Sequence, residues 1–136
     1  MLLAPPPAYV VTLPTGQVDG HAVLGAPIAR VEAALCRPLR VERFHIRRDL
    51  VYRGLEVITD GRRAWAILVT APSPQVVAPR TLERRLRASG LREGRRYRCD
   101  ARGCFGTFFG AHGTRRVIYG VKGGRPYLGV QIWPNP

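Results

Sequence analysis

Three cysteines are the residues whose spacing most directly suggests chemistry. Cys99 and Cys104 enclose four residues that include Gly103, and so short a turn can bring two sulfurs within disulfide reach. A loop of this size would stabilise the fold by about 2 kcal/mol in the chain-entropy model. Two alternatives stay open: reduced thiols, or a zinc ion held by Cys99, Cys104 and His112, although that spacing matches no standard zinc motif. Cys36 is left over, and we expect it to be buried at the end of a helix.

No arrangement of side chains predicts an enzyme. A nucleophilic cysteine would need a nearby histidine and an orienting carboxylate, and Cys36 is instead followed by Arg37 and Pro38. His45 and Asp49 would lie about 13 Å apart on an extended segment. The nine carboxylates are scattered, and no phosphate-binding Gly-Lys-Ser/Thr occurs. We therefore expect no catalytic residue, no metal ion and no cofactor.

The charge balance points to an anionic partner. Twenty-two basic and nine acidic residues give a net charge of +13, which attracts nucleic acid, anionic lipid or acidic proteins. Lys122 is the single lysine, so nearly all of the basic residues are arginine. This composition is more typical of a GC-rich coding sequence than of a nucleic-acid-binding surface, where lysine also contacts phosphates. The basic residues concentrate around a predicted second helix, where they form either a phosphate- or lipid-facing patch or a solvated helix face: Arg84, Arg85, Arg87, Arg92, Arg95 and Arg96.

Two successive groups of elements position these residues. Apolar spacing predicts a helix over 27–36, and a second helix that Thr81 caps and Gly90 ends. Asp60-Gly61 and Gly123-Gly124 are typical of two-residue hairpin turns. Alternation and β-branched residues predict the strands, over residues 9–12, 41–46, 51–58, 65–69, 97–99, 105–109, 117–121 and 127–133.

This order predicts an α+β fold, a tandem repeat of one helix followed by antiparallel strands, with the helices packed on one sheet face. We expect one compact domain of 136 residues. Its parts would be a partly extended N-terminal segment (1–22), a first helix-plus-hairpin half (23–72), a proline-rich linker (73–80) and a second helix-plus-strands half (81–136).

The final hairpin carries the candidate binding surface. With Gly123-Gly124 as the loop, Tyr119 faces Leu128, and one side of the hairpin is apolar and belongs to the core. The other side combines aromatic and cationic side chains, which are enriched in binding hot spots. The candidate residues are Arg116, Lys122, Arg125, Tyr127, Gln131 and Trp133. The alternative is that Tyr127 and Trp133 pack beneath a helix or the N-terminal segment.

Residues 23–38 (VLGAPIARVEAALCRP) place a leucine-glycine pair before a helix that a proline ends. This segment resembles one in outer-membrane assembly lipoproteins of the SmpA/OmlA type, in β-lactamase-inhibitor-protein-like domains and in secreted actinobacterial proteins with two such halves. The strand motif at 52–57 (YRGLEV) and the Cys99/Cys104 pair add to the resemblance, which runs from Val23 to Trp133; Cys36 stands where a glycine is expected. The resemblance implies a non-enzymatic, exported binding module that engages a protein through one sheet face.

The compartment follows from the cysteines rather than from the N-terminus. No basic residue precedes the short apolar stretch of residues 1–4, so a secretory signal is not visible. We expect an exported protein of the cell envelope or the extracellular space, with a cytoplasmic one as the alternative. No apolar run approaches the roughly 20 residues that a membrane-spanning helix needs. A protein partner is expected, a small basic nucleic-acid-binding protein is the alternative, and the oligomeric state stays open.

Overall fold

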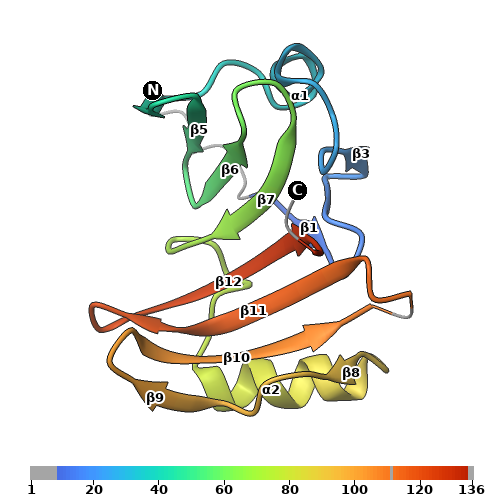
Figure 1. Cartoon of the computed structure of the whole chain (residues 1–136), viewed down its shortest axis with the longest axis vertical. Helices are drawn as coiled ribbons and strands as arrows, with labels where there is room; N and C mark the ends of the chain where they lie inside the picture. The colour runs from blue at the N-terminus through green and yellow to red at the C-terminus, as the bar shows by residue number, and fades with distance from the viewer. Residues whose placement is uncertain (1–8, 111, 135–136) are drawn as a thin grey trace, which may run out of the picture.

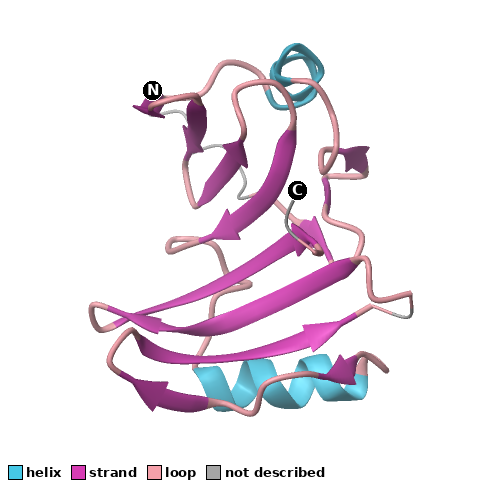
Figure 2. Ribbon diagram, viewed as in Figure 1, coloured by secondary structure: helices cyan, strands magenta, loops and turns pink. Residues whose placement is uncertain are grey.

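The computed structural model describes residues 9–110 and 112–134 and consists mostly of antiparallel β-structure (Figures 1 and 2). A large sheet of nine strands has the order β4-β5-β6-β7-β12-β11-β10-β8, with β9 also paired to β10, and a small sheet has the order β1-β2-β3. The elements are β1 (Val11–Thr12), β2 (Gln17–Val18), β3 (His21–Ala22), α1 (Ile28–Leu35), β4 (Arg40–Phe44), β5 (Arg47–Tyr52), β6 (Leu55–Thr59), β7 (Ala64–Val69), α2 (Pro79–Ala88), β8 (Arg92–Glu93), β9 (Arg98–Asp100), β10 (Gly103–Phe109), β11 (Arg115–Lys122) and β12 (Arg125–Ile132).

The predicted α+β tandem repeat, with a helix packed on a sheet in each repeat, is wrong. Two short helices of eight and ten residues accompany twelve described strands, and most strands belong to one sheet that continues through the β7–β12 pair. The expectation failed because hydrophobic periodicity reports local structure, whereas the pairing of Leu128 with Val69 joins segments far apart in the chain. The segment 51–58, predicted as one strand, also folds back at Gly54, which has a φ of +72°.

The two helices differ from prediction mainly at their ends. Helix α1 lies within the predicted range, and Cys36 caps its C-terminus with a φ of +67°, the positive φ for which glycine is usually chosen. The expected burial of Cys36 is wrong: Leu35 is the last buried residue of the helix, and Cys36, at the cap beyond it, is exposed. Helix α2 begins at Pro79 after Ala78, so Thr81 is not its cap; proline is favoured at a first helical position, since no hydrogen bond is lost there.

Of the two predicted hairpin turns, one is confirmed. Lys122 pairs with Arg125 across Gly123-Gly124, both glycines with positive φ. The Asp60-Gly61 turn is longer than predicted: residues 60–63 join β6 to β7, and the Asp60 carboxylate accepts hydrogen bonds from the backbone amides of the two arginines that follow Gly61. Such an Asx arrangement stabilises a wider turn than the two-residue type.

A single core lies on one face of the large sheet, which we call the inner face. Val31 and Leu35 of α1 and Leu82 and Leu86 of α2 are buried there, and Figure 1 shows the two helices at opposite ends of the sheet. The small N-terminal sheet also contributes valines to this core. The buried inner-face positions are Leu50, Tyr52, Leu55, Val57, Ile67, Val69, Phe108, Val117, Tyr119, Leu128 and Val130.

Residues 70–78 cross from β7 to α2 and are tied to the N-terminal sheet. The Gln75 side chain accepts a hydrogen bond from the Val11 N–H and donates one to the Val11 C=O, both at 2.8 Å. Ser73 is buried in the same crossing. Residues 1–8 of the predicted N-terminal segment lie outside the described residues. Within the described part of the chain, neither helix has the length and apolar character needed to cross a membrane.

Candidate binding face

All six residues of the predicted binding surface lie on the face of the sheet opposite the core, which we call the outer face. The register of the final hairpin is as predicted, with Tyr119 opposite Leu128 and Val117 opposite Val130. Because side chains alternate along a strand, the remaining positions of β11 and β12 point away from the core. Trp133 lies beside Arg116 and Phe109, and the hollow beside Tyr127 is lined by residues of β7, the turn after it, β11 and β12, none of them on a helix. The alternative of packing beneath the N-terminal segment falls partly on residues 1–8, which lie outside the described residues. That these six side chains form a binding surface stays a prediction.

An arginine is held between an aromatic ring and an amide on this face. The Arg116 guanidinium lies 4.0 Å from the centre of the Trp133 ring and donates a hydrogen bond of 3.0 Å to Gln131. Phe109 lies beside Trp133, with ring centres 6.1 Å apart. We call Phe109, Arg116, Gln131 and Trp133 the stacked cluster.

Arg116 has unused hydrogen-bonding capacity. Its Nε is buried without a hydrogen-bond partner, and no described carboxylate forms an ion pair with it. Burial lowers the pKa of the Arg116 guanidinium below its usual value, although arginine stays charged at neutral pH. A half-buried cation that lacks a counter-charge favours an incoming carboxylate, because the charge has lost part of its hydration.

Next to the stacked cluster the outer face is hollowed. The hollow has a volume of about 550 Å³ and is lined by Leu68, Thr70, Ala71, Ile118, Lys122, Arg125, Pro126 and Tyr127. Gly129 lies between Leu68 and Ile118, and a side chain there would approach Ile118. The hollow is therefore an apolar depression with the cations Lys122 and Arg125 at the hairpin end, and we call it the apolar hollow.

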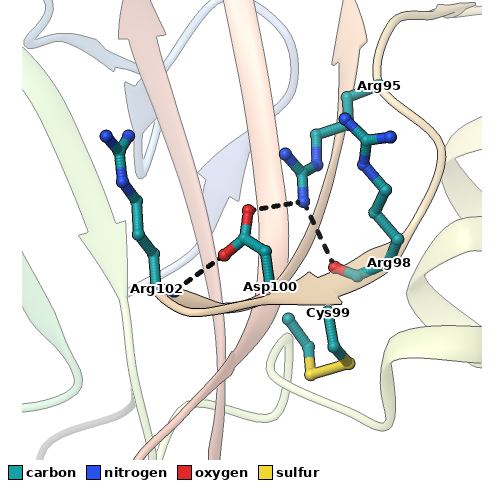
Figure 3. The surroundings of a disulfide bond; sticks show 6 residues. Arg95, Arg98, Cys99, Asp100 and Arg102 are labelled. Carbon is teal, nitrogen blue, oxygen red and sulfur yellow. Dashed lines mark hydrogen bonds and ion pairs between the residues drawn. A yellow bond between two sulfur atoms is a disulfide. The ribbon is translucent and has the colours of Figure 1, made fainter.

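The predicted disulfide is present at the far end of the same sheet (Figure 3). Cys99 and Cys104 are direct partners on β9 and β10 and are joined by a bond between their sulfurs, which leaves no thiolate there for the zinc alternative. On the other side of β9, Arg95 pairs with Asp100 at 3.1 Å and lies 3.8 Å from the centre of the Phe105 ring. The disulfide thus closes the turn that carries an outer-face ion pair.

The six arginines of the predicted basic patch do not form one surface. Arg92 and Arg95 cover the rings of Phe109 and Phe105 on the outer face. Arg84, Arg87 and Arg96 line a hollow of about 570 Å³ beside α2, together with Glu83, Arg80 and Tyr97. Arg87 is engaged by Glu83 and Glu93, and Arg85 lines a separate depression with Leu13 and Leu128. The positive charge is therefore divided among three places.

A cluster of carboxylates was missed by the sequence analysis, which treated the acidic residues as scattered. Glu42, Asp49 and Glu56 lie on the outer face of adjacent strands β4, β5 and β6, with ligand oxygens within 4.8 Å of one another. Arg47 binds the buried Asp49 through two hydrogen bonds of 2.8 and 2.7 Å, and Arg40 binds Glu42 at 3.0 Å. A metal ion would have to compete with both arginines. Strand register brings these residues together, and register is not visible in the local sequence.

Among the described residues, Glu56 is the carboxylate of this cluster that forms no ion pair with an arginine. Burial raises the pKa of Glu56, and the negative charges of Asp49 and Glu42 raise it further. Over β4–β6 the outer face therefore carries three carboxylates and the two arginines paired with two of them, whereas over β8–β12 it carries arginines beside aromatic rings.

Searches against family models, curated proteins and solved structures found no match to this chain.

Proposed function

We propose that the chain is a non-enzymatic, exported binding module that engages a protein through the outer face of β11 and β12. The observation that carries the proposal is Arg116, a half-buried cation that lies over the Trp133 ring and forms no ion pair with a described carboxylate. A partner would place a carboxylate at Arg116 and an apolar side chain in the apolar hollow. Gln131 and Tyr127 lie four residues apart on β12, or about 13 Å, so one partner segment can reach both.

The charges of the outer face support a protein partner over a nucleic acid. Single-stranded nucleic acids bind sheet surfaces by stacking bases on exposed rings, and here guanidinium groups already lie close to the Phe105 and Trp133 rings. Over β4–β6, Arg40 and Arg47 are already paired with carboxylates, so this end of the face attracts a phosphate chain little. A protein surface can present both signs of charge and match both ends of this face.

The Cys99–Cys104 disulfide supports an oxidising compartment, because structural disulfides persist mainly in exported proteins. Export also agrees with the resemblance carried by residues 23–38, which implies an exported module that engages a protein through one sheet face. The resemblance supports no particular partner.

The test is capture of a partner whose binding depends on the proposed residues. Immobilised wild-type protein would be incubated with the envelope and secreted fractions of the host, and the bound proteins compared with those of Tyr127→Ala/Trp133→Ala. The control variant is Arg30→Ala, an exposed arginine on α1 away from this face. We expect a protein that binds wild type and the control equally and is lost with the double variant.

Further measurements test the proposed face and separate a protein partner from a nucleic acid. Arg116→Gln should weaken capture of that protein, and a photoreactive group at position 127 should cross-link to it. If the double variant retained every partner, the proposed face would be wrong. If wild type instead bound DNA or RNA with log K falling steeply against log salt, the nucleic-acid alternative would replace the proposal.

A further inference from the structure

The two edges of the large sheet are built differently. At one edge, two short strands pair with different parts of β10: β8, of two residues, and β9, of three residues. At the other edge, β4 has five residues paired with β5, and no described strand pairs with its second side. Every second residue of β4 therefore directs its backbone N–H and C=O away from the sheet. Natural proteins usually shorten, charge or cover such an edge, because it can accept another strand. Strand β4 is charged at Arg40, Glu42 and Arg43, but it is not shortened and no described strand covers it.

The β4 edge also carries most of the exposed large hydrophobic side chains of the described chain. Of the five large hydrophobic residues that are exposed, four lie on β4 or directly beside it: Leu39 (74%), Val41 (39%), Phe44 (54%) and Ile46 (79%). An unpaired backbone and exposed apolar side chains coincide on one strand. This combination is what a strand-pairing interface requires.

We propose that the occupant of this edge is a second copy of the chain, with the two β4 strands pairing antiparallel about a two-fold axis at Val41. The proposal goes beyond the binding function above and concerns a different part of the molecule. Two-fold pairing is isologous, so each residue i of one copy faces residue j of the other and the reverse. The two large sheets would then continue into one another with their cores on the same side.

Charge complementarity selects this register. In a continuous two-fold sheet the axis passes through one facing pair of identical residues. An axis at Arg40 or Arg43 would place two arginines face to face, and an axis at Glu42 would place two glutamates face to face; like charges directly opposite are unfavourable. An axis at Phe44, the last residue of β4, would leave half of the strand unpaired. With the axis at Val41, the two valines meet, and Arg40 of each copy faces Glu42 of the other.

The side chains are already placed for these contacts. Arg40 and Glu42 lie on the same side of β4 and form an ion pair of 3.0 Å within one chain. In the dimer, four charges of alternating sign would lie in one group. Arg40 from the second copy would also bring positive charge to the acidic cluster of Glu42, Asp49 and Glu56, where carboxylate oxygens lie within 4.8 Å of one another.

Sedimentation equilibrium over a wide concentration range tests the dimer. We expect wild type to pass from monomer to dimer, and Arg40→Glu and Glu42→Arg each to weaken the dimer roughly tenfold or more, because each places two like-charged pairs across the axis. The double variant Arg40→Glu/Glu42→Arg should recover the wild-type dimer constant. Circular dichroism would confirm that each variant is folded.

Mixing the two single variants gives the sharpest result. The Arg40→Glu chain is negative at both positions 40 and 42, and the Glu42→Arg chain is positive at both. Every facing pair between the two variants then joins opposite charges, so an equimolar mixture should form a heterodimer although neither variant dimerises well alone. Val41→Lys should abolish the dimer, whereas Val10→Lys, at an exposed valine outside the large sheet, should not.

Three results would overturn the proposal: wild type that stays monomeric at every concentration, a charge swap that fails to restore the dimer, or a mixture that contains no heterodimer. These results would leave partner capture by Tyr127 and Trp133 unaffected. The dimer and the binding function therefore succeed or fail separately.

Discussion

The β4–β7 and β8–β12 sections of the large sheet bury the same kind of side chain in different ways. Each places a tyrosine in the core: Tyr52 is 5% exposed and Tyr119 is 0% exposed. The Tyr52 hydroxyl donates a hydrogen bond of 2.9 Å to the Cys36 carbonyl at the end of α1. The Tyr119 hydroxyl is buried with no partner among the described residues. Burial raises the pKa of Tyr119 to about 12.

The outer faces of the two sections differ as well. Over β4–β6 the outer face is built from ion pairs, and the section's two glycines lie in turns with positive φ. Over β10–β12 it is built from rings, guanidinium groups and glycines that lie within strands. Gly120 lies opposite both Phe105 and Tyr127. The comparison shows that one continuous sheet can present two chemically distinct surfaces, because the neighbours on each strand decide what its outer side chains contact.

The largest effect is expected from Gly120→Ala, which tests whether the second section depends on strand glycines. A methyl group there would collide with the Cys104 carbonyl oxygen and the Phe105 backbone, so we expect a loss of about 3 kcal/mol in the free energy of unfolding. Urea denaturation measures it. Gly110→Ala is the control, because the added atom would meet the Pro14 side chain at 3.2 Å, and the loss should be smaller. Equal losses would contradict the packing argument.

Removal of the disulfide should have the next largest effect. Cys99→Ser/Cys104→Ser should lower the free energy of unfolding by about 2 kcal/mol, because the unfolded chain regains the freedom of the closed loop. Thermal or urea unfolding of the oxidised wild type and the variant measures the difference. Cys36→Ser should change little, since Cys36 is free and exposed. If the double variant were as stable as wild type, the bond would have no stabilising role.

The two tyrosines offer a matched pair of substitutions. Tyr52→Phe should lower the free energy of unfolding by about 1 kcal/mol, because the Cys36 carbonyl loses its donor. Tyr119→Phe should leave it unchanged or raise it slightly, because a buried hydroxyl without a partner is removed. Chemical denaturation of both variants under one condition compares them. A larger loss for Tyr119→Phe would show that its hydroxyl has a partner after all.

The smallest effect is expected at the acidic cluster. The pKa of Glu56 is raised in the folded protein, so the native state holds this proton to higher pH than the unfolded state does. The stability contributed by the protonated carboxyl is therefore lost as the pH rises from the ordinary carboxyl range through the raised pKa. Glu56→Gln should accordingly be slightly more stable than wild type at neutral pH, and this advantage should shrink toward about pH 4, the ordinary carboxyl range. Urea denaturation at both pH values tests the sign, and an advantage that grew on acidification would contradict it.

Local signals predicted the parts of the fold that depend on neighbouring residues. The α1 segment, the Gly123-Gly124 turn and the Cys99–Cys104 bond each involve residues close together in the chain, and all three are present. The division of the final hairpin into a core side and an outer side was also correct, because its register follows from the turn. Helix ends and longer turns were less accurate: the cap at Thr81 and the two-residue turn at Asp60-Gly61 are both absent from the structure.

Contacts between distant segments could not be predicted in this way. The β7–β12 pair, which joins two predicted halves into one sheet, brings Ile67 next to Val130, and no local pattern encodes that choice. The acidic cluster and the exposed β4 edge depend on strand register and strand order, and both were missed. The six arginines around α2 are separated for the same reason. Residues that are close together in the sequence lie in different places on the molecule once the helix, the strands and the turns between them are formed.

The amino-acid sequence therefore specifies the Gly123-Gly124 turn, the disulfide, the charge balance and the two sides of the last hairpin, because these follow from backbone preferences and from the alternation of side chains along a strand. The tertiary structure determines which strands are neighbours and which strand is left at the edge. Those choices place Arg116 on Trp133 beside an apolar hollow and leave Val41 exposed at the end of the sheet. Their physical origin is the burial of one shared core, to which both helices and both sheets contribute.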